Sequence, residues 1–278
     1  MKVVLHALTK EFSTARGEFR ALGGIQFEVR EREFFGIIGP TGCGKTTLLQ
    51  IIAGMDKPTQ GSVEFVGDKR TKAMVSMVFQ ESALMPWRTV EDNVPLGDEF
   101  RNEERSLLKR VSQFFLEVVR LADFSGARPY ELSGGMKQKV AIARALANDP
   151  EVILMDEPFA NLDAQTRLLL REELLRIWER DKKTVILVTH NLEEAVMLCD
   201  RIAVLSAPPA VVKSVITVDL PRPRTIKSMS SPDFARCVEK IWDLLRYEVD
   251  KTMRENETPK PPAPEPNARR KSFFGGWQ

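Results

Sequence analysis

Residues 39–46 read G-P-T-G-C-G-K-T, a full match to the pattern of a phosphate-binding loop. An apolar run at 34–38 precedes the loop, and a helical pattern from Lys45 to Ala53 follows it. In this strand–loop–helix context glycines let consecutive backbone N–H groups face an anion, and the helix N-terminus adds its positive dipole end. Lys45 then supplies a charge for the β- and γ-phosphates, and the Thr46 hydroxyl supplies a ligand for Mg²⁺. The stretch predicts an α/β fold that binds a nucleoside triphosphate.

The loop and the first turn of its helix form one candidate set of nucleotide contacts. Its members are Gly39, Pro40, Thr41, Gly42, Cys43, Gly44, Lys45, Thr46 and Thr47. Cys43 reads most simply as a small filler inside the loop. The alternative for the whole stretch is a glycine-rich turn without a ligand, which the strand before it and the helix after it disfavour.

A second apolar strand, V-I-L-M-D-E at 152–157, ends in two carboxylates. Adjacent acids at the end of a buried strand are costly unless a metal or phosphate chemistry uses them. Asp156 is therefore expected to hold Mg²⁺, and Glu157 to orient or deprotonate the attacking water. The competing interpretation is a strand that happens to end in a solvated Asp-Glu pair.

Composition bounds the function classes. The chain has 278 residues, 43% of them hydrophobic, and a formal net charge of +2, which together exclude disorder of the whole chain and argue against an obligate nucleic-acid binder. Cys43, Cys199 and Cys237 are too few and too scattered for a disulfide scaffold or a four-ligand zinc site. Neither a signal peptide nor about 18 consecutive apolar residues occur, so we expect a membrane role only through a partner.

The expected secondary structure changes along the chain. Short strands are expected in residues 1–38, and helical spacing dominates about 90–150, as in a helical insertion within an α/β chain. Strands and helices alternate again up to about residue 220, which indicates a parallel sheet covered by helices. A last amphipathic helix begins at Ser231-Pro232 within a C-terminal extension, 221–257, and the proline-rich stretch 258–278 is expected to be disordered.

The stretch L-S-G-G-M-K-Q at 132–138 resembles the signature motif of ATP-binding cassette (ABC) ATPases. Other marks of that family follow in its order. They are Gln80 in V-F-Q (the Q-loop), Asp163 in A-N-L-D (the D-loop), His190 in L-V-T-H (the switch histidine) and Phe12, placed like the aromatic that stacks on adenine. The resemblance covers residues 1–220. It implies a P-loop NTPase cassette with a RecA-like core, an antiparallel β subdomain and an α-helical signature subdomain at about 90–150.

Finer features narrow the resemblance to importers of nitrate, sulfonates and taurine. They are L-M-P-W-R-T-V-E-D-N-V at 84–94, M-D-E-P-F-A-N-L-D-A-Q-T-R at 155–167 and V-D-L-P-R-P-R at 218–224. The resemblance implies a cassette on the cytoplasmic face of the inner membrane, bound to permease subunits and indirectly to an extracytoplasmic solute-binding protein. It assigns recognition of the solute to those partners, and it implies no nucleic acid.

The resemblance also implies roles for particular residues. Two copies would pair head to tail, so that one copy's signature residues and D-loop meet the ATP on the other copy's phosphate loop; these contacts are Ser133, Gly134, Gly135, Gln138 and Asp163. Glu157, His190 and Gln80 would be catalytic, and Thr46, Gln80 and Asp156 would hold Mg²⁺. Trp87, just past the Q-loop, would anchor the permease or else be a core residue.

Three points stay open from the residues. Phe12 lacks the polar group of Tyr or Trp and is alternatively a core aromatic at a strand end. Arg32 stands where a turn glycine often occurs in the family, which suggests a different turn. The rival functions are an ABC ATPase for export or lipid transport, which shares every catalytic motif, and a soluble ABC ATPase outside transport.

Overall fold

The computed structural model describes residues 1–14, 17–67 and 73–257. Its centre is a six-stranded sheet in the order β5-β6-β7-β3-β8-β9, in which the first five strands are parallel and β9 runs antiparallel to β8. The strands are β5 (Ala73–Val78), β6 (Pro150–Asp156), β7 (Thr184–Val188), β3 (Phe34–Ile38), β8 (Arg201–Leu205) and β9 (Val212–Thr217). All residues of β3 and β7 are buried, as their uninterrupted apolar sequences require in a sheet covered on both faces.

A separate antiparallel sheet, in the order β2-β1-β4, packs against the central sheet. Its strands are β1 (Lys2–Thr14), β2 (Gly17–Val29) and β4 (Gln60–Val66). The expectation of short strands at the N-terminus was wrong for β1 and β2, which have 13 residues each. They form one long hairpin whose register shifts at three irregularities, and such bulges interrupt the hydrophobic alternation by which a strand is recognised.

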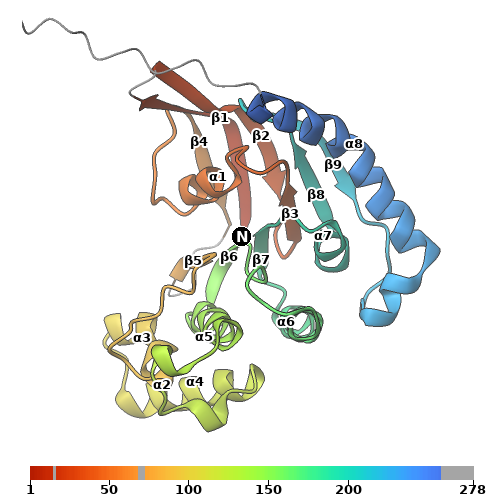
Figure 1. Cartoon of the computed structure of the whole chain (residues 1–278). Coiled ribbons are helices and arrows are strands. Elements are labelled where there is room, and N and C mark those ends of the chain that lie inside the picture. The colour runs from red at the N-terminus through yellow and green to blue at the C-terminus, as the bar shows by residue number, and fades with distance from the viewer. Residues whose placement is uncertain (15–16, 68–72, 258–278) are drawn as a thin grey trace, which may run out of the picture.

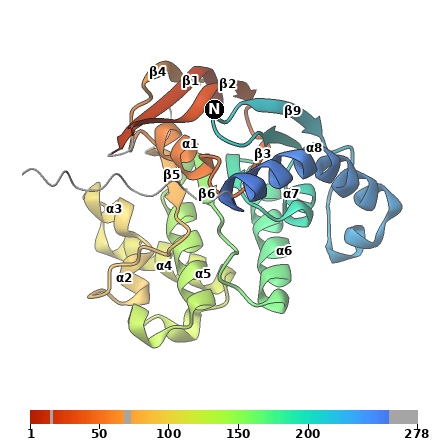
Figure 2. The same cartoon turned by 45° about the horizontal axis from the view of Figure 1, so that its top comes forward.

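Helices form a separate block between β5 and β6, as the sequence predicted. The block contains α2 (Val90–Asn93), α3 (Leu96–Phe100), α4 (Arg105–Val118), two 3-10 turns (Ala122–Phe124 and Pro129–Glu131) and α5 (Gly134–Ala147). In both views this block and the antiparallel sheet lie at opposite ends of the molecule, with the parallel sheet between them (Figures 1 and 2). Its small core joins α2, α4 and α5 through Val90, Leu116 and Val140.

The remaining helices are α1 (Lys45–Ile52), α6 (Ala164–Asp181), α7 (Leu192–Leu198) and α8 (Pro232–Glu257). The predicted start of α8 is confirmed, because Ser231 Oγ accepts a hydrogen bond from the amide of Phe234 at 3.2 Å. Phe234, Ile241 and Leu245 of α8 belong to the main core. The predicted disordered stretch 258–278 lies outside the described residues. Within the described parts of the chain, no helix has the length and apolarity that crossing a membrane requires.

The turn before β3 contradicts the expectation drawn from Arg32. Arg32 adopts φ +59°, the left-handed conformation in which glycine is favoured. Its amide donates to Thr184 Oγ1 at 3.0 Å. The turn therefore keeps a left-handed geometry despite the arginine, and the hydrogen bond to β7 helps to hold it.

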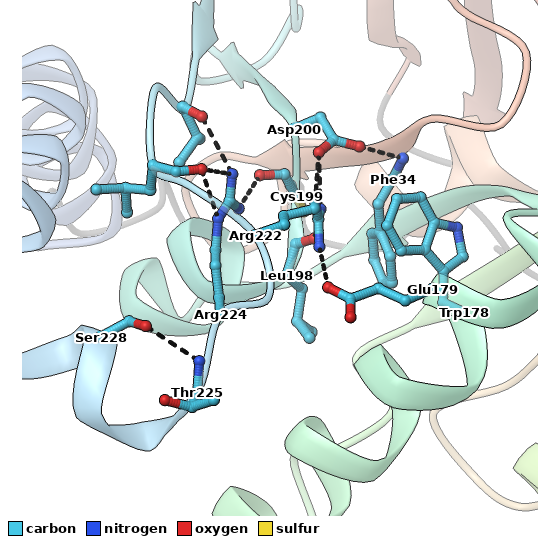
Figure 3. A network of polar contacts seen from close by, with 12 residues as sticks. Phe34, Trp178, Glu179, Leu198, Cys199, Asp200, Arg222, Arg224, Thr225 and Ser228 are labelled. Atoms are coloured by element: carbon cyan, nitrogen blue, oxygen red, sulfur yellow. Dashed lines mark hydrogen bonds and ion pairs between the residues drawn. The ribbon is translucent and has the colours of Figure 1, made fainter.

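The V-D-L-P-R-P-R stretch ties the C-terminal extension to the core (Figure 3). Arg222 bonds Asp200 Oδ1 and Leu198 O, and its guanidinium lies 4.4 Å from the centre of the Trp178 ring. Arg224 is 3% exposed and donates only to backbone carbonyls among the contacts found for it. This subfamily stretch thus has a structural use in the chain itself.

Candidate nucleotide-binding and catalytic site

The phosphate loop lies between β3 and α1 and is shaped by two glycines. Gly42 and Gly44 have φ +78° and +99°, and Gly44 is the N-cap of α1. Left-handed backbone at these positions lets the loop turn its N–H groups inward, which suits glycine. The Lys45 side chain is buried and donates to Gly39 O at 2.9 Å and Pro40 O at 2.8 Å. The cation is thereby held over the loop that an anion would enter.

Cys43 is fully buried against the start of the loop. A Cβ added at Gly39 would lie 2.8 Å from Cys43 Sγ, so the thiol fills the space that this glycine leaves. Burial raises the pKa of the Cys43 thiol. The side chain therefore acts as packing beneath the loop, as its simplest interpretation predicted.

Asp156 ends β6 beside the start of α1. Burial raises the pKa of this carboxyl, although its hydrogen bond with Thr46 acts in the opposite direction. Its Oδ1 atom is buried without a hydrogen-bond partner. An orphaned carboxylate oxygen next to a hydroxyl is a donor set that Mg²⁺ suits. Among the described residues, no group of three or more His, Cys, Asp or Glu gathers around a metal position, so a cation here needs phosphate or water oxygens as further ligands.

Glu157 and His190 meet at the carboxyl ends of neighbouring strands. β6 and β7 pair in parallel, Asp156 opposite Val188, and the Glu157 amide donates to Val188 O at 2.9 Å. Glu157 has φ +46°, a strained conformation for a residue with a side chain. His190 Nδ1 lies 3.0 Å from Glu157 Oε2. The backbone thus turns Glu157, which follows β6, toward His190, which follows β7. The two residues are far apart in the sequence but adjacent in space.

The signature residues stand at the N-terminus of α5. Ser133 is its N-cap, accepting from the Met136 amide, and both Ser133 and Gly134 are exposed. Gly135 packs on the D-loop, since an added Cβ would lie 2.9 Å from Leu162 Cδ2. Asp163 caps α6 by accepting from the Thr166 amide at 2.9 Å, and its bonds with Thr166 lower the pKa of its carboxyl.

Gln80 and Gln138 differ in their exposure and in their hydrogen-bond contacts. Gln80 is exposed after β5, and its carbonyl accepts weakly from Asn161 at 3.5 Å. Gln138 is 3% exposed, and its amide donates to Phe79 O at 3.1 Å. The Gln138 side chain therefore holds the Q-loop backbone to α5 within this chain.

Two aromatics with open interpretations both lie on the surface. Phe12 is 37% exposed on β1, with Lys10 Nζ 5.1 Å from its ring centre. Trp87 is 68% exposed. Neither is therefore a core residue of this chain.

Sequence reasoning missed a buried ion pair between the helices that follow Glu157 and His190. Arg171 of α6 and Glu194 of α7 meet at 2.6 Å, with side chains 3% and 4% exposed. Burial raises the pKa of Glu194, against the opposing effect of Arg171. The pair joins the helix after the D-loop to the helix after His190. Nothing in the sequence singles out Arg171 among the four arginines of α6.

A phosphate loop, a Thr–Asp pair suited to Mg²⁺ and a Glu–His pair on adjacent strand ends together define a P-loop ATPase. Residues 22–160 match the ABC transporter family. An uncharacterized ABC transporter ATP-binding protein of Methanocaldococcus jannaschii is 48% identical over 91% of this chain and 95% of its own length. The chain belongs to the ABC transporter ATP-binding family and is an ATPase of that family.

Two proteins named as import ATP-binding proteins are also similar. An aliphatic sulfonates import ATP-binding protein of Bacillus cereus is 42% identical over 89% of this chain and 97% of its own length. A nitrate import ATP-binding protein of Synechocystis is 41% identical over 88% and 96%. Among solved structures, the dimeric ATP-binding cassette MJ0796 bound to ADP and Pi has a TM-score of 0.71 at 32% identity, covering 79% of this chain and all of that one. This similarity confirms the predicted cassette fold.

Proposed function

We propose that this ATPase powers an importer of a small anion such as nitrate, a sulfonate or taurine, bound to a permease at the cytoplasmic face of the membrane. The names of the sulfonate and nitrate import proteins at 42% and 41% identity support this solute class. The observation that carries the transport part is Trp87, 68% exposed just past the Q-loop. Such an exposed aromatic suits an interface anchor.

The surface beside Trp87 is hollowed. A groove of about 960 Å³ lies among α2, α3 and the start of α4, lined by residues that include Arg88, Glu91, Glu99 and Lys109. An ion pair joins Arg88 and Glu99 at this groove. A concave, charged surface whose lining begins at Arg88, directly after the exposed Trp87, fits a short cytoplasmic segment of a permease that would bury the tryptophan.

The site residues support the following order of events in ATP hydrolysis. Phosphate oxygens replace the carbonyls of Gly39 and Pro40 as acceptors for Lys45, and the N-terminus of α1 adds backbone donors. Thr46, Asp156 and Gln80 would hold Mg²⁺, which would neutralise phosphate charge when bound.

Glu157 then takes a proton from the attacking water, and His190 orients the glutamate through its 3.0 Å contact and holds the γ-phosphate in line. Catalysis here consists of positioning and charge stabilisation. Phe12 supplies the face for the adenine base.

A second copy of the chain completes each site in this proposal. Ser133 and Gly134 expose a capped helix N-terminus, a ready donor set for the γ-phosphate of ATP bound to the other copy. The dimeric state of the cassette MJ0796 supports this arrangement. A single copy is then expected to hydrolyse ATP poorly, because half of its site belongs to its partner.

Co-purification tests the transport part. A tagged Glu157→Gln chain is extracted from native membranes in mild detergent, and its partners are identified by mass spectrometry. We expect a polytopic permease, and a severalfold lower permease yield when Trp87→Ala is added. Phe114→Ala, which removes an exposed aromatic of α4 outside the groove, is the matched control.

Nucleic acid or ribosomes in place of a permease would support the soluble alternative. A permease that co-purifies with a binding protein allows that protein to be screened against nitrate, sulfonates and taurine. Failure of all these anions to bind would contradict the solute class while leaving the ATPase intact.

A further inference from the structure

Glu248 of α8 is a buried carboxylate that the ATPase chemistry does not use. It is 6% exposed. Its Oε2 accepts from the backbone amide of Ala207 at 2.8 Å, and its Oε1 accepts from Lys213 Nζ at 2.8 Å. A buried carboxylate is stable only when its oxygens are satisfied, so the second half of α8 is held to the backbone at Ala207.

Ala207 lies in the turn between β8 and β9, residues 206–210, which we call the proline turn for its Pro208-Pro209 pair. The turn is joined to β2 through its last residue. The Ala210 amide donates to Ala21 O at 2.9 Å, and the Gly23 amide donates to Ala210 O at 2.8 Å. The turn therefore connects the central sheet to the antiparallel sheet by backbone bonds.

Both ends of the phosphate loop rest on the segments that the proline turn joins. An added Cβ at Gly44 would lie 3.0 Å from Leu22 Cδ2. Leu22 stands in β2 between the two residues that bond Ala210. An added Cβ at Gly39 would lie 3.1 Å from Leu205 Cβ, and Leu205 directly precedes the turn. The loop glycines thus lie close to Leu205, which directly precedes the turn, and to Leu22, whose two neighbours bond the turn.

We propose that Glu248 is a positioning residue for nucleotide binding, which holds the phosphate loop in its binding geometry through the proline turn. The C-terminal extension is then part of the nucleotide site, although it lies outside the cassette motifs. The path runs from Glu248 to Ala207, from Ala210 to β2, and from Leu22 and Leu205 to the two glycines. The steps are hydrogen bonds, the covalent chain of the turn and the close approach of Leu22 and Leu205 to the glycines, and closely packed groups transmit small displacements.

The charge of Glu248 supports this role. Burial by itself acts to raise the pKa of this carboxyl, but the hydrogen bonds from Lys213 and Ala207 outweigh burial and hold the pKa below its usual range. The side chain is therefore an anion at neutral pH, and its bond to the turn is charge-assisted.

Nucleotide affinity of three full-length variants tests the proposal. Glu248→Ala removes the acceptor for Ala207, and Glu248→Gln keeps a neutral acceptor of the same length. Glu239→Ala changes an exposed acid of the same helix and is the matched control. The dissociation constant for Mg-ADP is measured by calorimetry well below the thermal midpoint of each variant.

We expect Glu248→Ala to weaken Mg-ADP binding about three- to tenfold, as loss of one charge-assisted hydrogen bond allows. Glu248→Gln should stay within about twofold of the wild type, and Glu239→Ala should not change. A Glu248→Ala variant that melts earlier but binds Mg-ADP normally would show a purely structural role and overturn the proposal.

A measurement on the unaltered protein covers the case in which Glu248→Ala does not fold. Coupling between two sites is reciprocal, so Mg-ADP must tighten the contacts of the proline turn. Amide hydrogen exchange should slow about three- to tenfold at Ala207, Ala210 and Gly23 when Mg-ADP is bound. Exchange at these amides that is unchanged by Mg-ADP would refute the proposal.

Discussion

Replacement of Arg224 by methionine tests whether a single arginine fastens the C-terminal extension to the ATPase core. The guanidinium is 3% exposed and donates to four backbone carbonyls, those of Val196, Cys199, Val218 and Leu220, at 2.6–3.4 Å. The first two carbonyls are at the C-terminal end of α7, and Figure 3 shows Arg224 beside Cys199 there. That end carries the negative pole of the helix dipole, which a cation stabilises.

The expected loss follows from two opposing effects. Burying the charged guanidinium costs several kcal/mol of desolvation free energy, and the methionine variant avoids this cost. It also leaves four buried carbonyls without a donor, and each unsatisfied group costs about 1–3 kcal/mol. The carbonyls are fixed by α7 and by the chain after β9 and cannot turn to water, so the second effect is the larger. We expect Arg224→Met to lower the free energy of unfolding by about 3–5 kcal/mol.

Urea titration followed by tryptophan fluorescence measures this loss. Arg246→Met, at an exposed arginine of α8, should stay within about 0.5 kcal/mol of the wild type. Arg224→Lys should recover less than half of the loss, because one ammonium does not reach four carbonyls in the way that a planar guanidinium does. A loss below about 1 kcal/mol for Arg224→Met would refute the reasoning, since it would mean that water or repacking satisfies the carbonyls.

Four further outcomes follow from the site and the core. Glu157→Gln should retain ATP binding and lower steady-state phosphate release by about 10²–10⁴-fold, the contribution of a general base; a loss below tenfold would remove Glu157 from that role. Gly36→Ala should lose about 1–3 kcal/mol of stability in urea, because its Cβ would lie 2.9 Å from Cys199 Sγ. Adding Cys199→Ala should restore at least half of that loss, and no restoration would show that the clash lies elsewhere. Cys43, fully buried and with a raised thiol pKa, should react with iodoacetamide at pH 8 only as the protein unfolds, as peptide mapping of labelled protein would show; rapid labelling of folded protein would contradict this. The pKa of Glu248 is lowered from its ordinary 4.5 in the folded state, so its ionised form adds stability above that pH, and this is lost as the pH falls below it. The difference in thermal midpoint between wild type and Glu248→Gln should therefore become smaller below about pH 4.5. A difference that grows there would contradict the lowered pKa of Glu248 in the folded state.

Much of the site was predictable because its chemistry is local in sequence. The phosphate loop, the D-E pair and the signature turn each lie within eight residues, and each needs particular residue types at fixed spacing to build an anion or metal site. The buried runs of β3 and β7 and the serine cap of α8 were equally readable, because burial on both sheet faces and helix capping leave direct marks on the residues.

Features that depend on long-range contacts were harder to predict from the sequence. The bulges of the β1–β2 hairpin hide its 13-residue strands, since an inserted residue breaks the alternation on which prediction depends. The left-handed conformation of Arg32 carries no signal in its residue type, because tertiary hydrogen bonds impose it.

The sequence by itself determined that this chain is an ABC ATPase with its nucleotide loop, its adjacent carboxylates and its signature turn, because those features are set by neighbours along the chain. Only the tertiary structure decided that Glu157 faces His190, that Arg171 pairs with Glu194 and that Glu248 and Arg224 fasten the last helix. The partners in these pairs are separated by 23 to 41 residues in the sequence. Folding of the sheet and burial in its low-dielectric surroundings, rather than any local pattern, select the partner for each charge.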